Sequence, residues 1–232
     1  MAILFSRAPT PGLVKSRLHT HLSPEQACAL HVASTLDTAE LIARALPLAS
    51  KWIFWSEAPA PQDQTNALSG SLRLPRSFRA AVQQGDGLAE RMADAFSRAF
   101  TSGARHIVIF GSDSPTLPAA CIQQSFAALA DCDLVLGPTE DGGYYLIGCR
   151  QFDPRLFADV EWSTPRTFIQ TLRNAEQLGF RVQVLAPWYD LDEWKDVERM
   201  LQEARQGRPL PRHLVVFLEQ LRKEKGETAP PL

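Results

Sequence analysis

The chain has 232 residues, 45% of them hydrophobic and 22% charged, with a formal net charge of −2 at pH 7. This is the composition of an ordinary globular protein, and it gives no reason to expect a nucleic acid as partner. Because no apolar run approaches the roughly 18 residues of a membrane span and no signal peptide is recognisable, we expect a cytoplasmic protein without a membrane partner.

The cysteines are widely scattered and show neither a CxxC pair nor zinc-like spacing to a histidine. They are Cys28, Cys121, Cys132 and Cys149. In a cytoplasmic chain we expect these thiols to be reduced and mostly buried.

The N-terminal part of the chain predicts a strand, a loop and a long helix. Residues 2–5 are apolar and typical of a buried strand. A helix begins after Ser23, which suits the N-cap, with Pro24 at the first helical position and Gln26 completing a capping box. Five apolar residues follow at helical spacing and are expected to face the sheet: Ala29, Val32, Leu36, Ala39 and Ala43.

The remaining elements alternate between strand and helix. Strands are predicted at 52–56, 106–111, 133–138, 144–149 and 181–185. Helices are predicted at 88–100, about 118–130, about 164–178 and from Glu193, with a last amphipathic stretch at 210–225. Residues 57–77 predict a loop with a short helix. The short connection before 144–149 is unusual for a parallel pair of strands.

This alternation, with no linker or internal repeat, predicts an α/β fold. We expect a single three-layer α/β/α domain over residues 1–225, with a mostly parallel central sheet. Residues 226–232 are expected to form a flexible C-terminal tail.

Ligands of open parallel sheets bind outside the carboxyl ends of the strands, and an aspartate follows the clearest strand there. Asp113 lies in GSDSPTL (111–117), between Ser112 and Ser114. Its carboxylate is a hard oxygen ligand suited to Mg²⁺ or Mn²⁺. The alternative is that Asp113 caps the following helix.

A second acidic cluster, WYDLDEWKDV (188–197), follows the last predicted strand. Asp190 and Asp192 point to opposite faces of an extended chain, so that one of them can meet Asp113 and complete a cation clamp. The alternative is a cap for the next helix, with Glu193 and Asp196 serving its dipole.

A literal DxD occurs at residues 131–133, but at the amino edge of the predicted sheet. Ligands bind at the opposite edge. We therefore reject it as a metal site and expect a solvated turn.

Two glycine-containing segments also lie at the ligand edge. In GPTEDGGYYLIG (137–148), the Gly142–Gly143 pair permits a turn with positive φ, and Glu140 and Asp141 are placed to bind an acceptor hydroxyl, a cation or a sugar. The same pattern is also a good hairpin turn. In QQGDGLAER (83–91), glycines precede a helix whose backbone N–H groups can cradle a nucleobase or phosphate, although this signal is weak alone.

The loop FSRAPTPGLVKSRL (5–18) carries three cations and no acidic residue. The cations are Arg7, Lys15 and Arg17, and Gly12 allows close approach of a ligand. Such a loop suits a di- or triphosphate, and its alternative is a solvated basic loop. A metal clamp and a cationic loop on one edge would together neutralise phosphates during transfer.

The order of these motifs resembles the DUF2064 proteins, also called radical-SAM/selenodomain-associated transferase 1, in the GT-A-like nucleotide-diphospho-sugar transferase superfamily. The shared order is PGxVKSRL, QxGxxLxxRM, GSDSPTL, GPxxDGGYYLIG, WST and DLDxxxD, from Phe5 to about Val197. Two features depart from the wider superfamily. SRAPTPG replaces the glycine-rich LxxGGxxxR loop, and serines flank Asp113 in place of a strict DxD.

The resemblance implies a GT-A-like fold and a set of site residues. Those expected to bind nucleotide or phosphate are Arg7, Gly12, Lys15, Ser16, Arg17, Gln83, Gly87 and Leu88. Those expected to bind substrate are Gly142, Gly143, Tyr145, Trp162, Ser163 and Thr164. The expected catalytic residues are Lys15, Asp113 and Asp141, and the expected metal ligands are Asp113 and Asp192, with Asp190 as the rival of Asp192.

The resemblance also implies a transferase that uses Mg²⁺ or Mn²⁺, a nucleotide or nucleotide-sugar and a small-molecule acceptor. Two chemistries stay open. The family's usual description leans toward glycosyl transfer from an NDP-sugar, whereas the cationic loop favours nucleotidyl transfer from an NTP to a phosphorylated acceptor, with release of pyrophosphate. A third hypothesis is a nucleotide-binding module without catalysis, against which the intact acidic positions argue.

Overall fold

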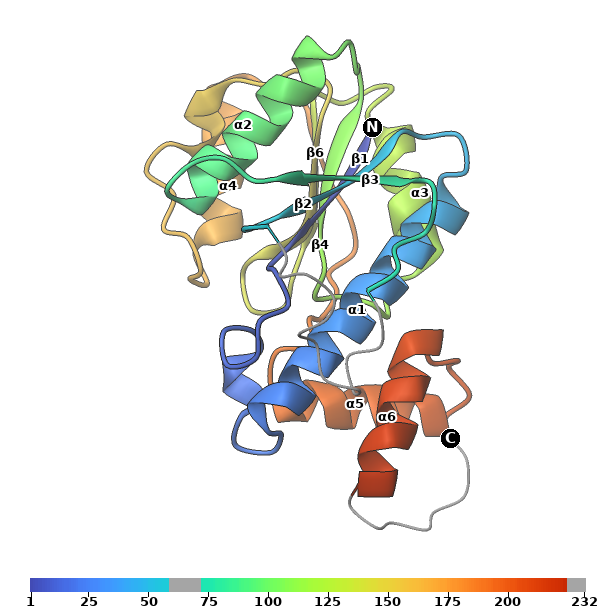
Figure 1. Cartoon of the computed structure of the whole chain (residues 1–232). Coiled ribbons are helices and arrows are strands. Elements are labelled where there is room, and N and C mark those ends of the chain that lie inside the picture. Colours follow the sequence, from blue (N-terminus) through green and yellow to red (C-terminus); the bar gives the residue numbers. More distant parts are fainter. Residues whose placement is uncertain (59–71, 225–232) are drawn as a thin grey trace.

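The computed structural model describes residues 1–58 and 72–224, arranged around a seven-stranded sheet (Figure 1). The order across the sheet is β3-β2-β1-β4-β6-β5-β7, and only the pairs that involve β6 are antiparallel. The strands are β1 (Ala2–Ser6), β2 (Lys51–Trp55), β3 (Phe78–Val82), β4 (Ile107–Gly111), β5 (Leu134–Pro138), β6 (Tyr144–Cys149) and β7 (Val182–Val184). The predicted α/β class with a mostly parallel sheet is confirmed.

The helices of the described residues cover both faces of this sheet. They are α1 (Pro24–Ala45), α2 (Leu88–Thr101), α3 (Ala119–Ala128), α4 (Thr167–Gln177), α5 (Trp194–Arg205) and α6 (Arg212–Glu224). In Figure 1, α2 and α4 lie on one side of the sheet and α1 and α3 on the other, which gives the three predicted layers. Helices α5 and α6 lie beyond the sheet, beside the first half of α1.

Strand β1 shows how the sequence divides the core into two faces. Successive side chains of a strand point to opposite sides. Ala2 and Leu4 accordingly pack into the cluster formed with α1 and α3, whereas Ile3 and Phe5 pack into the cluster formed with α2 and α4. Because both faces are covered, the strand is buried along its whole length and reads as one apolar run.

Helix α1 begins as predicted, but its residues 27–39 are buried on all sides. Ser23 accepts a hydrogen bond from the Gln26 N–H, and the Gln26 side chain accepts one from the Ser23 N–H, so that the capping box is confirmed. Ala39 faces the sheet as expected. Ala29 does not, because it packs in a third apolar cluster with residues of α5 and α6. This cluster fixes α5 and α6 next to the loop that precedes α1.

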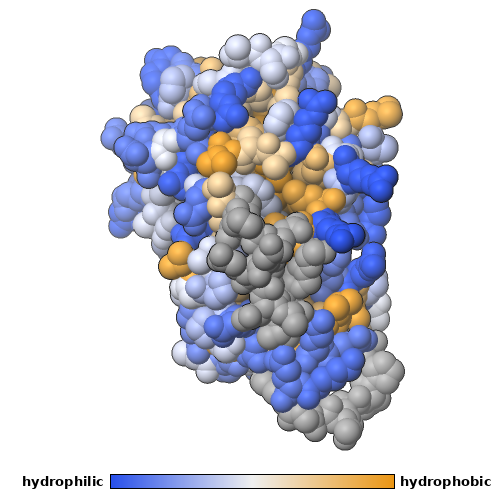
Figure 2. Space-filling view, viewed as in Figure 1, coloured by the Kyte–Doolittle hydropathy of each residue, from blue (hydrophilic) through white to orange (hydrophobic). Residues whose placement is uncertain are grey.

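Two strands differ from a simple alternating pattern. Strand β3, with the sequence FRAAV, was missing from the prediction, since it lies at the sheet's edge and is only partly buried. Strand β6 runs antiparallel between β4 and β5, which explains the short connection that precedes it. The face shown in Figure 2 carries apolar surface near its centre, where β3 crosses in Figure 1, amid largely hydrophilic surroundings.

The other predicted helices and strands are confirmed within a few residues. Residues 59–71 of the predicted loop, and the predicted tail at 226–232, lie outside the described residues. Three of the four cysteines are buried, Cys132 is half-buried, and none of the four is in a disulfide. Within the described parts of the chain, no helix combines the length and the apolar character that crossing a bilayer requires.

Candidate active site at the carboxyl edge of the sheet

The structure brings together three of the residues predicted to act on phosphate and metal: Lys15, Asp113 and Asp192. Neighbouring strands β1 and β4 are parallel, so the loops that follow them meet at one edge. The Lys15 ammonium nitrogen lies 2.5 Å from Asp113 Oδ1 and 2.9 Å from Asp192 Oδ1. The lysine side chain is only 3% exposed, whereas the two aspartate side chains are 41% and 40% exposed. The cluster is thus a buried cation beneath two carboxylates that face solvent.

The loop that carries Lys15 is anchored on both sides of that residue. Val14 and Leu18 are buried, and the Arg7 guanidinium donates a hydrogen bond of 3.1 Å to the Leu13 carbonyl. Lys15 itself has a left-handed backbone conformation, with φ of 50°. A residue that is neither glycine nor asparagine rarely adopts this conformation. The backbone is therefore locally strained at Lys15, whose side chain is buried in the protein.

The charges of this cluster hold one another in place. Burial lowers the pKa of Lys15, but the carboxylates of Asp113 and Asp192 outweigh it and keep that pKa above its ordinary value. Burial likewise raises the pKa of Asp113, and Lys15 outweighs it and holds that pKa below its ordinary value. Lysine and Asp113 are therefore both charged at neutral pH.

The structure separates the two aspartates between which the sequence could not choose. Asp192 shares Lys15 with Asp113, whereas Asp190 accepts a hydrogen bond from the Ser114 hydroxyl. Burial and the nearby charge of Asp113 raise the pKa of Asp190 to about 7. Leu191, which lies between Asp190 and Asp192 in the sequence, donates its N–H to the Asp113 carbonyl. This hydrogen bond joins the two acidic segments. Of the pair, Asp192 is the one that contacts Lys15 with an exposed side chain, which is the geometry expected of the predicted ligand.

Sequence reasoning missed a buried polar network behind the loop. His31 of α1, which is 3% exposed, donates from Nε2 to the Arg7 carbonyl at 3.0 Å, and Thr35 lies 3.1 Å from the Ser6 hydroxyl. Burial lowers the pKa of His31, so the ring is neutral and its Nε2 carries the donated proton. The available signal was a histidine amid the apolar positions of the predicted helix. These contacts tie α1 to the point where β1 becomes the loop.

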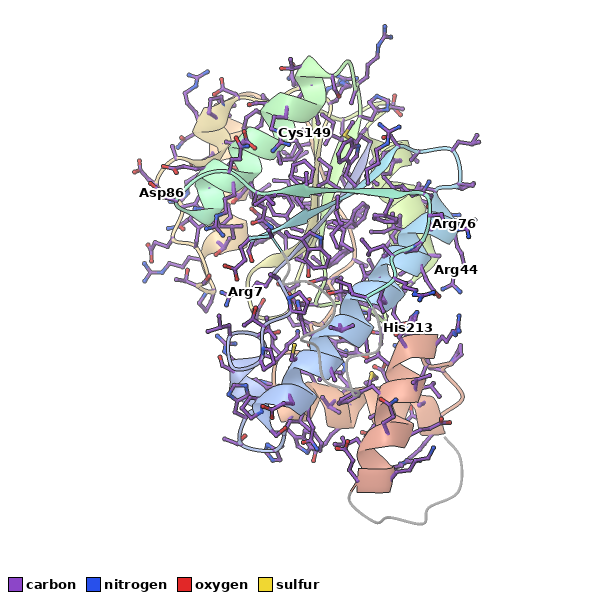
Figure 3. The ribbon with its side chains drawn as sticks, viewed as in Figure 1. Arg7, Arg44, Arg76, Asp86, Cys149 and His213 are labelled. Atoms are coloured by element: carbon purple, nitrogen blue, oxygen red, sulfur yellow. The ribbon has the colours of Figure 1, made fainter. Side chains whose placement is uncertain are left out.

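The other predicted residues of the loop lie nearer the surface. Arg7 lies where the loop leaves β1 (Figure 3), and Gly12 has a φ of +82°. Ser16 begins a short 3₁₀ helix, Ser16–Leu18. The Arg17 side chain is 63% exposed and lies 3.8 Å from Glu193. Arg17 is thus an exposed cation at the rim, and Lys15 a buried cation inside.

The DGG turn and the WST segment, far apart in sequence, lie side by side. The Gly142 carbonyl accepts a hydrogen bond from the Phe168 N–H at 2.9 Å. Gly142 has a φ of +90°, and a Cβ there would lie 2.3 Å from the Pro165 carbonyl oxygen, so that this position requires glycine. Asp141 Oδ1 accepts from the Thr139 hydroxyl and the Gly143 N–H. These contacts hold the turn in place at the carboxyl edge of the sheet. Asp141, a predicted catalytic residue, forms part of the turn.

The aromatic residues predicted to bind substrate are held by the core. Tyr145 is 2% exposed, and its hydroxyl donates to the Ala186 carbonyl at 2.9 Å. The Trp162 ring packs edge-on against Tyr144 and Phe157. Ser163 has a φ of 59°, and the Thr164 hydroxyl donates to the Glu161 carbonyl. These residues shape the turn before α4.

The segment predicted to recognise the base is built as a helix start. The Gln83 amide donates to the Phe54 carbonyl at 2.8 Å, which joins β2 to the end of β3. Gly87 is the N-cap of α2, and Leu88 begins the helix with 41% of its surface exposed. Asp86 lies beside this helix start in Figure 3. The segment stands two strands away from Lys15 along the same edge.

The rejected DxD lies at the amino edge of β5 as expected, and Asp131 is exposed in a turn as predicted, but Asp133 is not solvated. Asp133 is 6% exposed and accepts hydrogen bonds from Arg150 at 2.6 Å and from the Arg181 N–H at 2.9 Å. That part of the prediction was wrong, because two arginines distant in sequence fold over the carboxylate. Burial raises the pKa of Asp133, but these donors outweigh it and lower that pKa to about 2.

Among the described residues, one other group has three ligand types close together: Asp37, Glu40 and His213, within 4.8 Å of one another. His213 lies between α1 and α6 in Figure 3. Asp37 accepts hydrogen bonds from the N–H groups of His213 and Leu214, at 2.9 Å each. A helix N-terminus favours anions over cations. Asp37 is better explained as the cap of α6, and Glu40 as the partner of His213 Nε2 at 3.0 Å, than as parts of a metal site.

Comparison with solved structures identifies the class of protein to which this fold and edge belong. A crystal structure from Desulfovibrio desulfuricans G20, named as a "putative nucleotide-diphospho-sugar transferase", is 30% identical, with a TM-score of 0.78, and the match covers 89% of this chain and 87% of the other. CMP:2-keto-3-deoxy-manno-octonic acid synthetase in complex with CTP is 11% identical, with a TM-score of 0.51 over 89% of this chain and 98% of the other. The 4-diphosphocytidyl-2C-methyl-D-erythritol synthase of Anaerococcus prevotii DSM 20548 is 10% identical, with a TM-score of 0.55 over 87% and 96%.

Residues 40–164 match the family described as "Uncharacterized protein conserved in bacteria (DUF2064)". The chain belongs to this family. A search among curated proteins found no match. The predicted family and the nucleotide-diphospho-sugar transferase fold are thus confirmed, and the predicted enzyme class, a transferase, agrees with these relatives.

The residues at the carboxyl edge fit a hard divalent cation. Asp113 and Asp192 direct one oxygen each to a single point that already holds a positive charge, the Lys15 ammonium. Their side chains remain open to solvent, and Mg²⁺ and Mn²⁺ prefer carboxylate oxygens together with water. The donor set and its exposure therefore suit the predicted ion.

Proposed function

We propose that the protein is a metal-dependent transferase that acts on a nucleotide-activated substrate, with an NDP-sugar as the favoured donor. The observation that carries the proposal is the convergence of Lys15, Asp113 and Asp192 at the carboxyl edge of β1 and β4. A cation beside two exposed carboxylates is the arrangement that can hold a diphosphate through both its negative charge and its metal ion.

In this proposal each residue type has a separate task. Asp113 and Asp192 would hold Mg²⁺ or Mn²⁺, which when bound supplies positive charge to the diphosphate leaving group. Lys15 and Arg17 bind phosphate oxygens, Lys15 from the interior and Arg17 from the rim. The segment from Gln83 to Leu88 faces the base, and the DGG turn with the WST segment faces the sugar or the acceptor.

Glycosyl transfer in this site joins an acceptor hydroxyl oxygen to the anomeric carbon of the sugar. The bond from that carbon to the diphosphate oxygen breaks, the nucleoside diphosphate leaves with the electron pair, and the proton of the acceptor hydroxyl passes to solvent. Because negative charge grows on the diphosphate, fixed cations at its oxygens stabilise the transition state more than the ground state. The acceptor is expected to be a small molecule, and a cytoplasmic location stays a prediction from the sequence.

Nucleotidyl transfer is the second candidate, and the cationic loop favours it. Lys15 is fixed in the loop that follows β1, with Arg17 two residues later at the rim, and this spacing suits a triphosphate chain as well as a diphosphate. A phosphorylated acceptor would then attack the α-phosphate of an NTP, and pyrophosphate would leave. A non-catalytic nucleotide-binding module is the third candidate.

A thermal-shift panel of NTPs and NDP-sugars, each with and without Mg²⁺ or Mn²⁺, tests the proposal. A true ligand at about 100 times its Kd stabilises the protein by about 2.7 kcal/mol. A metal-dependent shift with one NDP-sugar supports glycosyl transfer, and a shift confined to NTPs supports nucleotidyl transfer. No shift with any nucleotide contradicts the proposal.

A further inference from the structure

Lys15 stands at the point where the two predicted metal ligands converge. Its ammonium contacts one oxygen of Asp113 and one of Asp192, and the rest of the side chain is enclosed by the protein. Two positive ions cannot share one pair of carboxylates without strong repulsion. The lysine and a divalent cation are therefore alternative partners of the same oxygens.

We propose that the Lys15 ammonium is a built-in counter-ion, which occupies the cation position between Asp113 and Asp192 until a divalent cation displaces it. This inference rests on the metal-binding part of the proposed function. It adds that Lys15 competes with the metal ion for the two carboxylates, so that the position of its ammonium depends on whether metal is bound. A displaced Lys15 is then free to pair with a phosphate group.

Three features of the cluster support the exchange. The lysine is enclosed, but the carboxylates are 41% and 40% exposed, so an ion can reach them from the solvent side and displace the ammonium. The left-handed backbone at Lys15 directs its side chain inward at the expense of local strain. Asp113 and Asp192 belong to different loops, held together by the Leu191 N–H bond to the Asp113 carbonyl. The two acidic segments are thus joined by a contact that does not involve the lysine.

The exchange links the binding of metal and phosphate. Metal alone must displace the ammonium from both of its carboxylate partners, which costs the free energy of those two contacts. A phosphate group that accepts Lys15 removes this penalty, so that metal and nucleotide each strengthen the binding of the other, as linkage requires. In the absence of a phosphate ligand, the protein is expected to bind divalent metal weakly.

The first experiment labels lysine amines of the wild-type protein and follows each site by mass spectrometry. Without metal, Lys15 should react with an acylating reagent far more slowly than Lys195, whose side chain is 73% exposed. Saturating Mn²⁺ should raise Lys15 labelling by roughly fivefold or more and leave Lys195 unchanged, because displacement exposes the amine. Mn²⁺ that binds without any change at Lys15 overturns the proposal.

The second experiment measures Mn²⁺ affinity by calorimetry in the absence of nucleotide. Lys15→Met removes the competing charge and should tighten Mn²⁺ binding by roughly tenfold or more, even with solvent screening. Lys195→Met is the matched control, since Lys195 pairs with Glu193 at 2.7 Å, next to Asp192, and should change the affinity less than about twofold. Should Lys15→Met fail to fold, Lys15→Gln keeps hydrogen-bonding capacity without charge.

The outcomes separate this inference from the proposed function. Equal Mn²⁺ affinity in Lys15→Met and the wild type overturns the exchange, as does the absence of Mn²⁺ binding to both proteins. A tighter Mn²⁺ site in Lys15→Met supports the exchange even if no nucleotide binds, in which case only the proposed transferase function fails. Nucleotide binding without metal linkage removes the exchange and the metal dependence of the proposed function, and leaves only its nucleotide-binding part.

Discussion

Two charged clusters at opposite edges of the sheet are built in opposite ways. At the amino edge, one buried carboxylate, Asp133, lies beneath two partly exposed arginines. At the carboxyl edge, one buried ammonium, Lys15, lies beneath two partly exposed carboxylates. Both clusters join segments distant in sequence, and both contain the acidic residues that a motif search would select.

The two clusters differ in how many of their carboxylate oxygens already accept hydrogen bonds from the protein. Both oxygens of Asp133 accept hydrogen bonds, one from Arg150 and the other from the backbone and side chain of Arg181. Among the described residues, Asp113 and Asp192 each use a single oxygen, and that for the same lysine. A carboxylate whose bonds are all satisfied stabilises the fold, whereas one with an open oxygen facing solvent can bind a ligand.

Asp113→Asn should have the largest effect of the changes that test this contrast. It removes one of the two charges expected to hold metal, so turnover with the nucleotide substrate found in the binding panel should fall by roughly a hundredfold or more. Steady-state kinetics with added Mn²⁺ measures this. Asp131→Asn, an exposed aspartate at the amino edge, is the control. Unchanged metal-dependent turnover would remove Asp113 from the mechanism.

Asp133→Asn should affect stability and leave ligand binding intact. Arg150 and Arg181 lose their buried anionic partner, so the free energy of unfolding should fall by about 2 kcal/mol. Urea unfolding of the variant, the wild type and Asp131→Asn measures the difference. A loss of nucleotide or metal binding in the Asp133 variant would show that the two edges are coupled and would break the comparison.

The contribution of Asp133 to stability should also appear in the pH dependence of unfolding. The pKa of Asp133 is about 2 in the folded protein, whereas its ordinary value, expected in the unfolded chain, is 3.8. Because the folded value is the lower one, the stabilisation is complete above the unfolded pKa and is lost as the pH falls from about 4 toward 2. Urea midpoints near pH 5 and pH 3 should differ less in Asp133→Asn than in the wild type. An equal change in urea midpoint between the two pH values in both proteins would exclude Asp133 as the source of the pH dependence.

Arg17→Ala should have the smallest effect on stability. Its contact with Glu193 is long, at 3.8 Å, and the side chain is 63% exposed. Exposed ion pairs contribute little, so the thermal midpoint should move by no more than about 1 °C. The affinity for the nucleotide should nevertheless fall severalfold, most at low salt. A large drop in thermal midpoint would mean that Arg17 supports the loop instead of serving its ligand.

The sequence alone determined most of the elements, though not the edge strand β3, and the edge on which the site lies. Local signals sufficed wherever neighbours in the chain carry the information, as in the capping box of Ser23 and Gln26 and in the apolar run of β4. Motif order was enough for the family, and the carboxyl-end rule for the placement of Asp113. These inferences hold because period, capping and strand direction depend on short stretches of the chain.

Only the tertiary structure decided which charged groups meet. The pairing of Lys15 with Asp113 and Asp192 spans 98 and 177 residues, and nothing local to Asp190 or Asp192 distinguishes the two. The same holds for Asp133, whose burial comes from arginines on other segments, and for Ala29, whose neighbours are α5 and α6. Burial and charge pairing are properties of surfaces brought together by folding, and so they lie beyond what periodicity and spacing can specify.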